Sequence, residues 1–271
     1  MTCPYCGLGA NTHEFLTLGQ RQYVQAYCHL ASVATDSPDG EYVLDMDDVA
    51  GASGRDLPKP KYYYTEESQQ NRFHCVACGA FNDILGRYGY CSNCGTFNAL
   101  AELDKDVSRI RERIASGRDL ESSVRDSVAS FDSFARQIAK QLAHRVPMTQ
   151  QRRNEWKRRL FHRLSDAVSD LQDVFDIDLV QGMTSDDVAF ATLMFHRRHL
   201  YEHNGGEVDE RYINDSGDRS LRSKQLLRES PQSAARIVKV VLQLGTNLSR
   251  GFHRIFAAQE APIRIARRLP K

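Results

Sequence analysis

An arginine and two histidines, spaced along one short segment, are the residues of this chain best suited to chemistry. Arg198, His199 and His203 lie within the run Arg198-His199-Leu200-Tyr201-Glu202-His203-Asn204. Histidine exchanges a proton near neutral pH, and arginine binds a charged phosphate through its guanidinium group. Residues four apart share a helix face, so His199 could orient His203, and Glu202 could pair with Arg198. Together these groups could cut RNA without a metal ion.

The same run also has a purely structural interpretation. Glycines at 205 and 206 are typical of a helix C-terminus, where the helix dipole favours a protonated histidine. Asn204 could then either bind a phosphate or simply help to end the helix. The other histidines after residue 98 have no comparable context and are interpreted as core or solvated side chains: His144, His162, His196 and His253.

A basic run precedes this segment on what we expect to be a single helix. Such a run could hold an RNA backbone, although a solvated charged face is the more common explanation. The residues concerned are Arg152, Arg153, Lys157, Arg158, Arg159 and Arg163.

Four cysteines in two CxxC knuckles predict a structural zinc site. Cys75 and Cys78 form the first knuckle, Cys91 and Cys94 form the second, and a glycine follows each pair. Each knuckle turns two thiolates towards one point, and two such turns close a tetrahedral site with no open position for catalysis. The segment from Phe81 to Tyr90 is long enough for a short hairpin between them.

A further knuckle at the N-terminus predicts a second zinc ion with an incomplete ligand set. Cys3 and Cys6 form this knuckle, and Cys28 follows in an expected strand from Tyr23 to Cys28. His29 is the expected fourth ligand, with His13 as the alternative. A decayed ribbon held by hydrophobic packing is the competing interpretation.

Charge and cysteine placement divide the chain into two parts. Residues 1–97 carry 6 Lys/Arg against 11 Asp/Glu, whereas residues 98–271 carry 30 against 24. A phosphate backbone should therefore prefer the second part. All seven cysteines lie between Cys3 and Cys94, which favours metal-bound thiolates in a reducing cytosol. We expect no signal peptide, no membrane span and a cytoplasmic location.

The second part has the periodicity of helices. One apolar stripe runs from Val124 to Leu142 and ends before Pro147, and another runs from Trp156 to Phe175. Thr184 starts a helix that leads into the arginine–histidine segment, and a last long helix carries Ile237 to Leu248. The expected fold is mainly α, a four- to five-helix bundle preceded by a small β-rich zinc-ribbon module. The expected domains are residues 1–64, a zinc-knuckle and β module; 65–100, the four-cysteine ribbon; and 101–271, the bundle.

The segment from Phe195 to Ile213 resembles the HEPN domains of prokaryotic defence and toxin systems, and the likeness covers roughly residues 120–250. In that family an arginine, a polar residue and a histidine four positions later form a ribonuclease site, and Arg198, His199 and His203 match it. The resemblance implies that two copies pair into one composite site, which cleaves without metal and leaves a cyclic phosphate. Some members carry a tyrosine as a modification site where this chain has Gly205, so that form of regulation is not expected.

These observations predict a metal-independent endoribonuclease of the defence or toxin type, acting as a homodimer on RNA. Arg198, His199 and His203 would be catalytic, with Glu202 and Asn204 in support. One or two structural zinc ions would be bound, none of them catalytic, and the acidic zinc module would serve as a sensor, a restraint or a dock for a regulatory protein. The alternatives are a non-catalytic RNA-binding or adaptor scaffold and, less favoured, a zinc-ribbon regulator of DNA.

Overall fold

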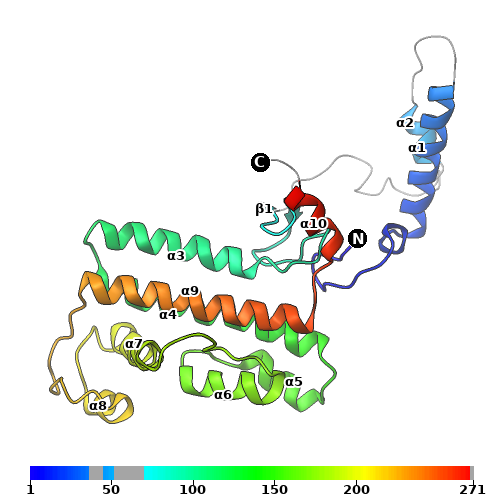
Figure 1. The fold of residues 1–271 in the computed structure, drawn as a ribbon. Coiled ribbons are helices and arrows are strands. Elements are labelled where there is room, and N and C mark those ends of the chain that lie inside the picture. The colour runs from blue at the N-terminus through cyan, green and yellow to red at the C-terminus, as the bar shows by residue number, and fades with distance from the viewer. Residues whose placement is uncertain (37–44, 52–69, 269–271) are drawn as a thin grey trace.

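The computed structural model describes residues 1–36, 45–51 and 70–268, and these are mainly helical. Ten α-helices and one two-stranded sheet occur in these ranges (Figure 1). Within them, no helix is long and apolar enough to cross a membrane. The glycine, proline and charged residues from Gly51 to Pro60 predict a loop or linker, and all of it after Gly51 lies outside the described residues.

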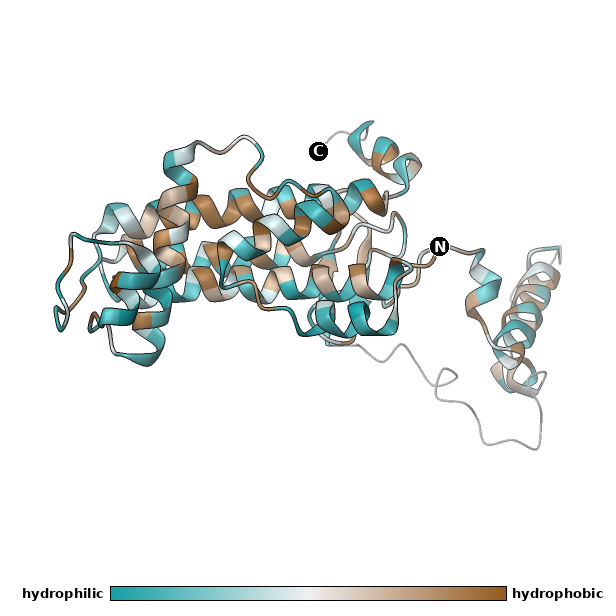
Figure 2. Ribbon diagram, turned by 90° about the horizontal axis from the view of Figure 1, so that it is seen from below, coloured by the Kyte–Doolittle hydropathy of each residue, from teal (hydrophilic) through white to brown (hydrophobic). Residues whose placement is uncertain are grey.

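Three long helices form the centre of the bundle. They are α3 (Ala99–Ala115), α4 (Leu120–Arg145) and α9 (Pro231–Ile255), which contact one another pairwise, and α7 (Ser185–His203) packs across α4 and α9 (Figure 1). The buried side chains of these helices are mostly apolar. Figure 2 shows hydrophobic and hydrophilic residues alternating along their ribbons. The predicted stripe on α4 is confirmed, since Val124, Phe131 and Leu142 are fully buried.

The predicted continuous helix from Trp156 to Phe175 is wrong. The structure has α5 (Gln150–Arg158) and α6 (Leu164–Phe175), separated by five non-helical residues. Phe161 in this break is completely buried, and its backbone N–H donates to the Oδ1 atom of Asp132 on α4 at 2.5 Å. Because the helix is interrupted here, the Phe161 side chain can enter the core. The residues that follow it, His162 and Arg163, lie beside α7.

The arginine–histidine helix starts as the sequence predicts. The Thr184 hydroxyl accepts a hydrogen bond from the backbone N–H of Asp187 at 3.1 Å, which satisfies one of the free N–H groups in the first turn of α7. Two short helices were not predicted: α8 (Glu210–Ser216), which packs on α7, and α10 (Glu260–Arg268).

The cysteine ribbon is a two-stranded antiparallel sheet around the first knuckle. Strand β1 (Asn71–His74) pairs with β2 (Phe81–Ile84), with His74 opposite Phe81. The hairpin therefore encloses residues 75–80 and does not lie within Phe81–Tyr90 as predicted. Ile263 and Ala266 of α10 pack on the cysteine cluster, so the end of the predicted 101–271 bundle returns to the ribbon.

The predicted strand Tyr23–Cys28 is also wrong. These residues lie in α1 (Leu18–Asp36), which follows a 3-10 helix (η1, Thr12–Phe15) and precedes α2 (Met46–Gly51). Reciprocal hydrogen bonds between Thr17 and Gln20 form a capping box at the start of α1, with distances of 2.8 and 3.3 Å. The described part of the 1–64 segment is therefore helical rather than β-rich.

A histidine links the ribbon to the bundle and makes this contact sensitive to pH. The Nε2 atom of His253 on α9 accepts from the Phe97 backbone N–H at 3.4 Å, while its Nδ1 atom lies 3.2 Å from the Phe256 carbonyl oxygen. Accepting at Nε2 requires the neutral ring. Burial lowers the pKa of His253 below its ordinary value, and the nearby charge of Arg145 lowers it further.

We expect the free energy of unfolding to fall as the pH drops below the ordinary histidine pKa of 6.5. The unfolded chain then binds the His253 proton more readily than the folded chain does, so the stabilisation present above 6.5 is lost on acidification. Urea unfolding above and below this pH, with His253→Gln beside wild type, measures the effect. An equally steep pH dependence in the variant would remove His253 as its cause.

Candidate functional site

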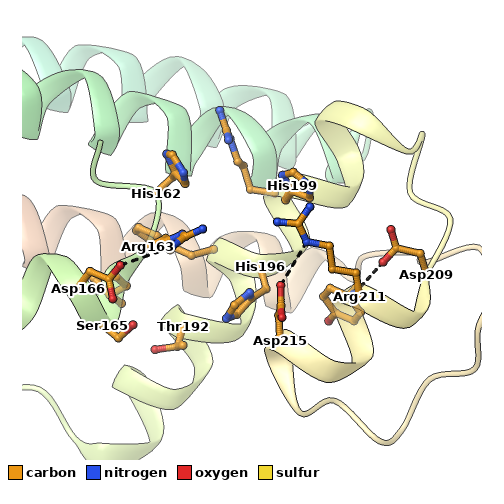
Figure 3. Close-up of a pocket in the computed structure, with 14 residues that line it drawn as sticks. His162, Arg163, Ser165, Asp166, Thr192, His196, His199, Asp209, Arg211 and Asp215 are labelled. Carbon is orange, nitrogen blue, oxygen red and sulfur yellow. Dashed lines mark hydrogen bonds and ion pairs between the residues drawn. The ribbon is translucent and has the colours of Figure 1, made fainter. Parts of the chain in front are cut away.

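A cavity of about 450 Å³ lies beside the arginine–histidine segment. Three parts of the chain form its walls. They are the segment that leads into α6 together with the start of α6, the helix α7, and the start of α8 with most of that helix, so residues distant in the sequence meet here (Figure 3). Its lining residues are His162, Arg163, Leu164, Ser165, Asp166, Thr192, Phe195, His196, Arg198, His199, Asp209, Arg211, Tyr212 and Asp215.

Arg198 and His199, two of the three predicted catalytic residues, line this cavity. The Arg198 guanidinium forms the predicted ion pair with Glu202 one turn further along α7. Its Nε atom is buried and has no hydrogen-bond partner among the described residues. A buried donor without an acceptor is costly. An anion in the cavity could provide the missing acceptor.

His203 and Asn204 lie beside the cavity rather than in its wall. The His203 ring is exposed, with its centroid 4.6 Å from that of His199. The Asn204 side chain donates to Asp209 at 2.8 Å, and its backbone N–H donates to the Leu200 carbonyl. Asn204 therefore ends the helix and holds Asp209, as the structural interpretation predicts.

Two histidines that the sequence analysis assigned to the core or solvent face this cavity. His162 enters from the segment before α6, and His196 lies one turn before Leu200 on α7 (Figure 3). Burial lowers the pKa of both below the ordinary value of 6.5. The pKa of His199 is also lowered, first by burial and then by the charge of His203. Neutral imidazoles near pH 7 can accept protons, as a general base must.

The cationic side chains of the cavity are balanced by neighbouring acids. Arg163 lies 3.9 Å from Asp166, and Arg211 lies 3.5 Å from Asp215. Both arginine side chains are 70% exposed, so these pairs are weak and can open for a phosphate.

The predicted basic run does not lie on a single helix. Arg152, Lys157 and Arg158 are exposed on α5, and Arg153 is half-buried there. Arg159, after the helix end, pairs with Asp170 on α6. Of the six, Arg163 alone lines the cavity.

Arg197, next to Arg198, belongs to a buried network beneath the cavity. It donates to Glu229 at 3.1 Å and to Asp218 at 3.4 Å. The Tyr201 hydroxyl also donates to Glu229, at 2.6 Å, and the Glu229 side chain is only 1% exposed. Burial alone would lower the pKa of Arg197, but hydrogen bonding and the charge of Glu229 raise it.

Replacing Arg197 with alanine should lower the free energy of unfolding by about 3–5 kcal/mol, because it leaves the buried Glu229 carboxylate uncompensated. Arg211→Ala removes an exposed pair with Asp215 and should cost at most about 1 kcal/mol. Urea unfolding of both variants measures the difference. A similar small loss in both would mean that the Arg197 network does not support the fold.

Four cysteines form a buried cluster that could hold a metal ion. The Sγ atoms of Cys75 and Cys94 are 3.6 Å apart, as are those of Cys78 and Cys91. A tetrahedral zinc ion with bonds of about 2.3 Å separates its sulfur ligands by about 3.8 Å, so the cluster fits zinc. Mutual hydrogen bonds among the thiols lower the pKa of Cys91 and raise the pKa values of Cys75 and Cys94, and a bound metal would need all of them as thiolates.

Amide and hydroxyl groups surround this cluster. The Asn82 amide donates to the Cys91 sulfur at 3.6 Å, and the Thr96 hydroxyl lies 3.1 Å from the Cys94 sulfur. Such contacts orient thiolates and are typical of a structural metal site.

The structure does not assemble the predicted N-terminal ligand set. Among the described residues, the four ribbon cysteines are the one group of three or more potential ligands that lie together. Cys28 and His29 are exposed on α1, away from Cys3 and Cys6, because the expected strand is a helix. His13 on η1 pairs with Glu14 instead.

No family model matches this chain, and neither a curated protein nor a solved structure matches it. The candidate site therefore depends on its own residues and geometry.

Proposed function

We propose that this protein is an endoribonuclease that cleaves RNA at the Arg198 cavity without a catalytic metal ion. The observation that carries the proposal is the position of Arg198, with its buried unpaired Nε, in a cavity lined by three histidines. Arginine stabilises the negative charge that develops on phosphorus, and histidines transfer protons near neutral pH.

The reaction would be an internal transesterification. The ribose 2′-oxygen bonds to phosphorus as the bond to the 5′-oxygen breaks, which leaves a cyclic phosphate. One imidazole takes the 2′-OH proton, and a second gives a proton to the departing 5′-oxygen. Arg198 would exchange Glu202 for the phosphate, while His199 orients His203 through their ring contact.

The two imidazoles can come from one chain or from two. His203 is exposed beside the cavity, where a second copy of the chain could approach it. We therefore propose a homodimer in which the two motifs meet. His162 offers a second imidazole within the same chain. If a histidine of the second copy transfers the second proton instead, His162→Ala should retain cleavage.

The test uses purified protein with a labelled single-stranded RNA and DNA of the same sequence, in excess chelator. We expect the RNA to be cut and the DNA to remain intact. Zinc content measured after the reaction checks that the ribbon metal has been retained. Intact RNA at an excess of protein would contradict the proposal, as would equal cutting of DNA.

The exposed basic residues of α5 should contribute to RNA binding through the phosphate backbone. Affinity for RNA falls as the salt concentration rises. Replacing Arg152, Lys157 and Arg158 with alanine should make this dependence shallower, reducing the magnitude of the slope of log affinity against log salt by about 2. Arg109, Arg111 and Arg118, which are exposed around the end of α3, provide a matched triple alanine control. Equal slopes in both variants would show that α5 is only a solvated face.

A non-catalytic RNA-binding scaffold is the second candidate. The Arg198–Glu202 pair favours it, since Glu202 could keep the Arg198 guanidinium away from a reacting phosphate. Salt-dependent binding without any cleavage would support it. A zinc-ribbon DNA regulator is less favoured because residues 1–97 are acidic.

A further inference from the structure

The N-terminal segment has the backbone of a zinc knuckle, although no third metal ligand groups with Cys3 and Cys6 in the part of the chain that the structure describes. The Cys3 backbone N–H donates to the Leu8 carbonyl at 2.9 Å, and the Gly7 N–H donates to the Cys3 carbonyl at 3.0 Å. Gly7 has a φ of +70°, a conformation that suits glycine. The Cys3 and Cys6 side chains contact each other in this loop.

The two ribbon knuckles have the same backbone pattern. Cys75 and Cys91 donate to the carbonyl five residues later, each at 2.9 Å, and the glycine four residues later donates back at 2.7 and 2.8 Å. Gly79 and Gly95 have φ values of +73° and +76°. These two knuckles face each other and form the four-cysteine cluster. The N-terminal knuckle is therefore half of such a site, with its backbone already in place.

The N-terminal knuckle is held firmly on the ribbon. The Thr2 N–H donates to the Ser92 carbonyl at 2.7 Å, and the Tyr90 N–H donates to the Pro4 carbonyl at 2.8 Å. A Cβ atom at Gly7 would lie 2.8 Å from the Tyr90 ring, so the loop packs closely. Both thiols of this knuckle are partly exposed, whereas the four ribbon cysteines are buried. Leu8, beside them, is 65% exposed.

Helix α1 cannot easily complete this site. Cys28 and His29 are consecutive on a helix and point about 100° apart, so both cannot face one ion. Both views show α1 projecting away from the ribbon (Figures 1 and 2). The chain's other CxxC knuckles are used in the ribbon, so a further knuckle must come from another molecule.

We propose that Cys3 and Cys6 bind a zinc ion together with Cys3 and Cys6 of a second copy of this chain. Two identical knuckles would close a four-thiolate site, as the two ribbon knuckles do within one chain. The exposed Leu8 side chain would be covered at this contact. The site would join two chains at the ribbon, far from the Arg198 cavity along the bundle (Figure 1).

Metal stoichiometry of the full-length protein tests this site. Reduced protein is loaded with zinc, freed of excess metal and analysed for metal and protein. We expect about 1.5 zinc ions per chain, one in each ribbon and one shared by two chains. The Cys3→Ser/Cys6→Ser variant should bind about 1.0, whereas the control Cys28→Ala/His13→Ala should remain at about 1.5. Molecular mass cannot test this site, because the dimer proposed for ribonuclease activity would have the same mass as a zinc-linked dimer. The number of zinc ions per chain does distinguish them.

Cobalt substitution checks the ligand set independently. The proposal predicts that the additional half-equivalent of cobalt has the absorption of a four-thiolate site, and that this absorption is missing from Cys3→Ser/Cys6→Ser. About 2 zinc ions per wild-type chain, falling to about 1 in the Cys28/His13 control, would assign the site to one chain and overturn the proposal. About 1 per wild-type chain, unchanged in every variant, would also overturn it.

Discussion

Replacing Arg198 with alanine is expected to slow RNA cleavage by about 10²–10³-fold, because the phosphorane-like transition state loses its positioned cation. His203→Ala should slow it by about 10²–10⁴-fold through the loss of a proton-transfer group. The Arg198 side chain is half-buried and the His203 side chain is exposed, and neither belongs to the buried Arg197 network, so the fold should survive. Single-turnover cleavage of a labelled RNA measures the rates.

Arg109→Ala and His144→Ala are the matched controls for these variants. Both positions are exposed and lie away from the cavity lining, so wild-type rates are expected. Wild-type rates in Arg198→Ala as well would place cleavage elsewhere or in a contaminant. Thermal unfolding of each variant separates a catalytic loss from a folding defect.

Replacing Cys91 with serine is expected to remove one tightly bound metal ion per chain and to unfold the ribbon. Structural zinc binds zinc-finger peptides with about 10–16 kcal/mol, and most of this energy stabilises the fold because the site is absent from the unfolded chain. Tyr90 and Phe97, on either side of the second knuckle, belong to the main core. The loss should therefore reach the bundle and lower its melting temperature.

Metal analysis and thermal unfolding of Cys91→Ser measure both effects, with Cys28→Ser as the control. Cys28 is exposed on α1 and lies outside the cluster, so its variant should keep its metal and its stability. An unchanged metal content in Cys91→Ser would mean that the four ribbon cysteines do not bind a metal.

The features that the sequence predicts correctly are those set by local periodicity and fixed spacing. The stripe from Val124 to Leu142 becomes α4, Thr184 caps α7, and the two ribbon knuckles bring their thiols together. In each case the signal is contained in a few consecutive residues. The ion pair between Arg198 and Glu202 was predicted for the same reason, since four residues separate its members.

The errors occur where tertiary contacts decide. The apolar residues from Trp156 to Phe175 fit one helix, but burial of Phe161 against α4 breaks it. Asp166, an acid in the first turn of α6, was the one available sign of the new helix start, since the N-cap residue Arg163 makes no side-chain cap hydrogen bond. That break brings His162 to the cavity, which is why the sequence does not predict His162 as a site residue.

The N-terminal segment carries a helix signal as well as a cysteine pattern, and the helix forms. Thr17 and Gln20 form a capping box, which is visible in the sequence as a threonine followed three residues later by glutamine. Cys28 and His29, the expected partners of Cys3 and Cys6, therefore lie on a helix and not at the end of a strand.

Analysis of the cleaved ends tests the central claim most directly. The substrate is a DNA oligonucleotide with a single ribonucleotide, treated with wild-type protein in excess chelator beside Arg198→Ala. Attack by the 2′-oxygen predicts cleavage only after the ribonucleotide and a cyclic phosphate on the 5′ fragment. Cleavage by the variant should be about 10²–10³-fold slower. Cleavage at deoxynucleotides, or a free 3′-hydroxyl on the 5′ fragment, would contradict the account.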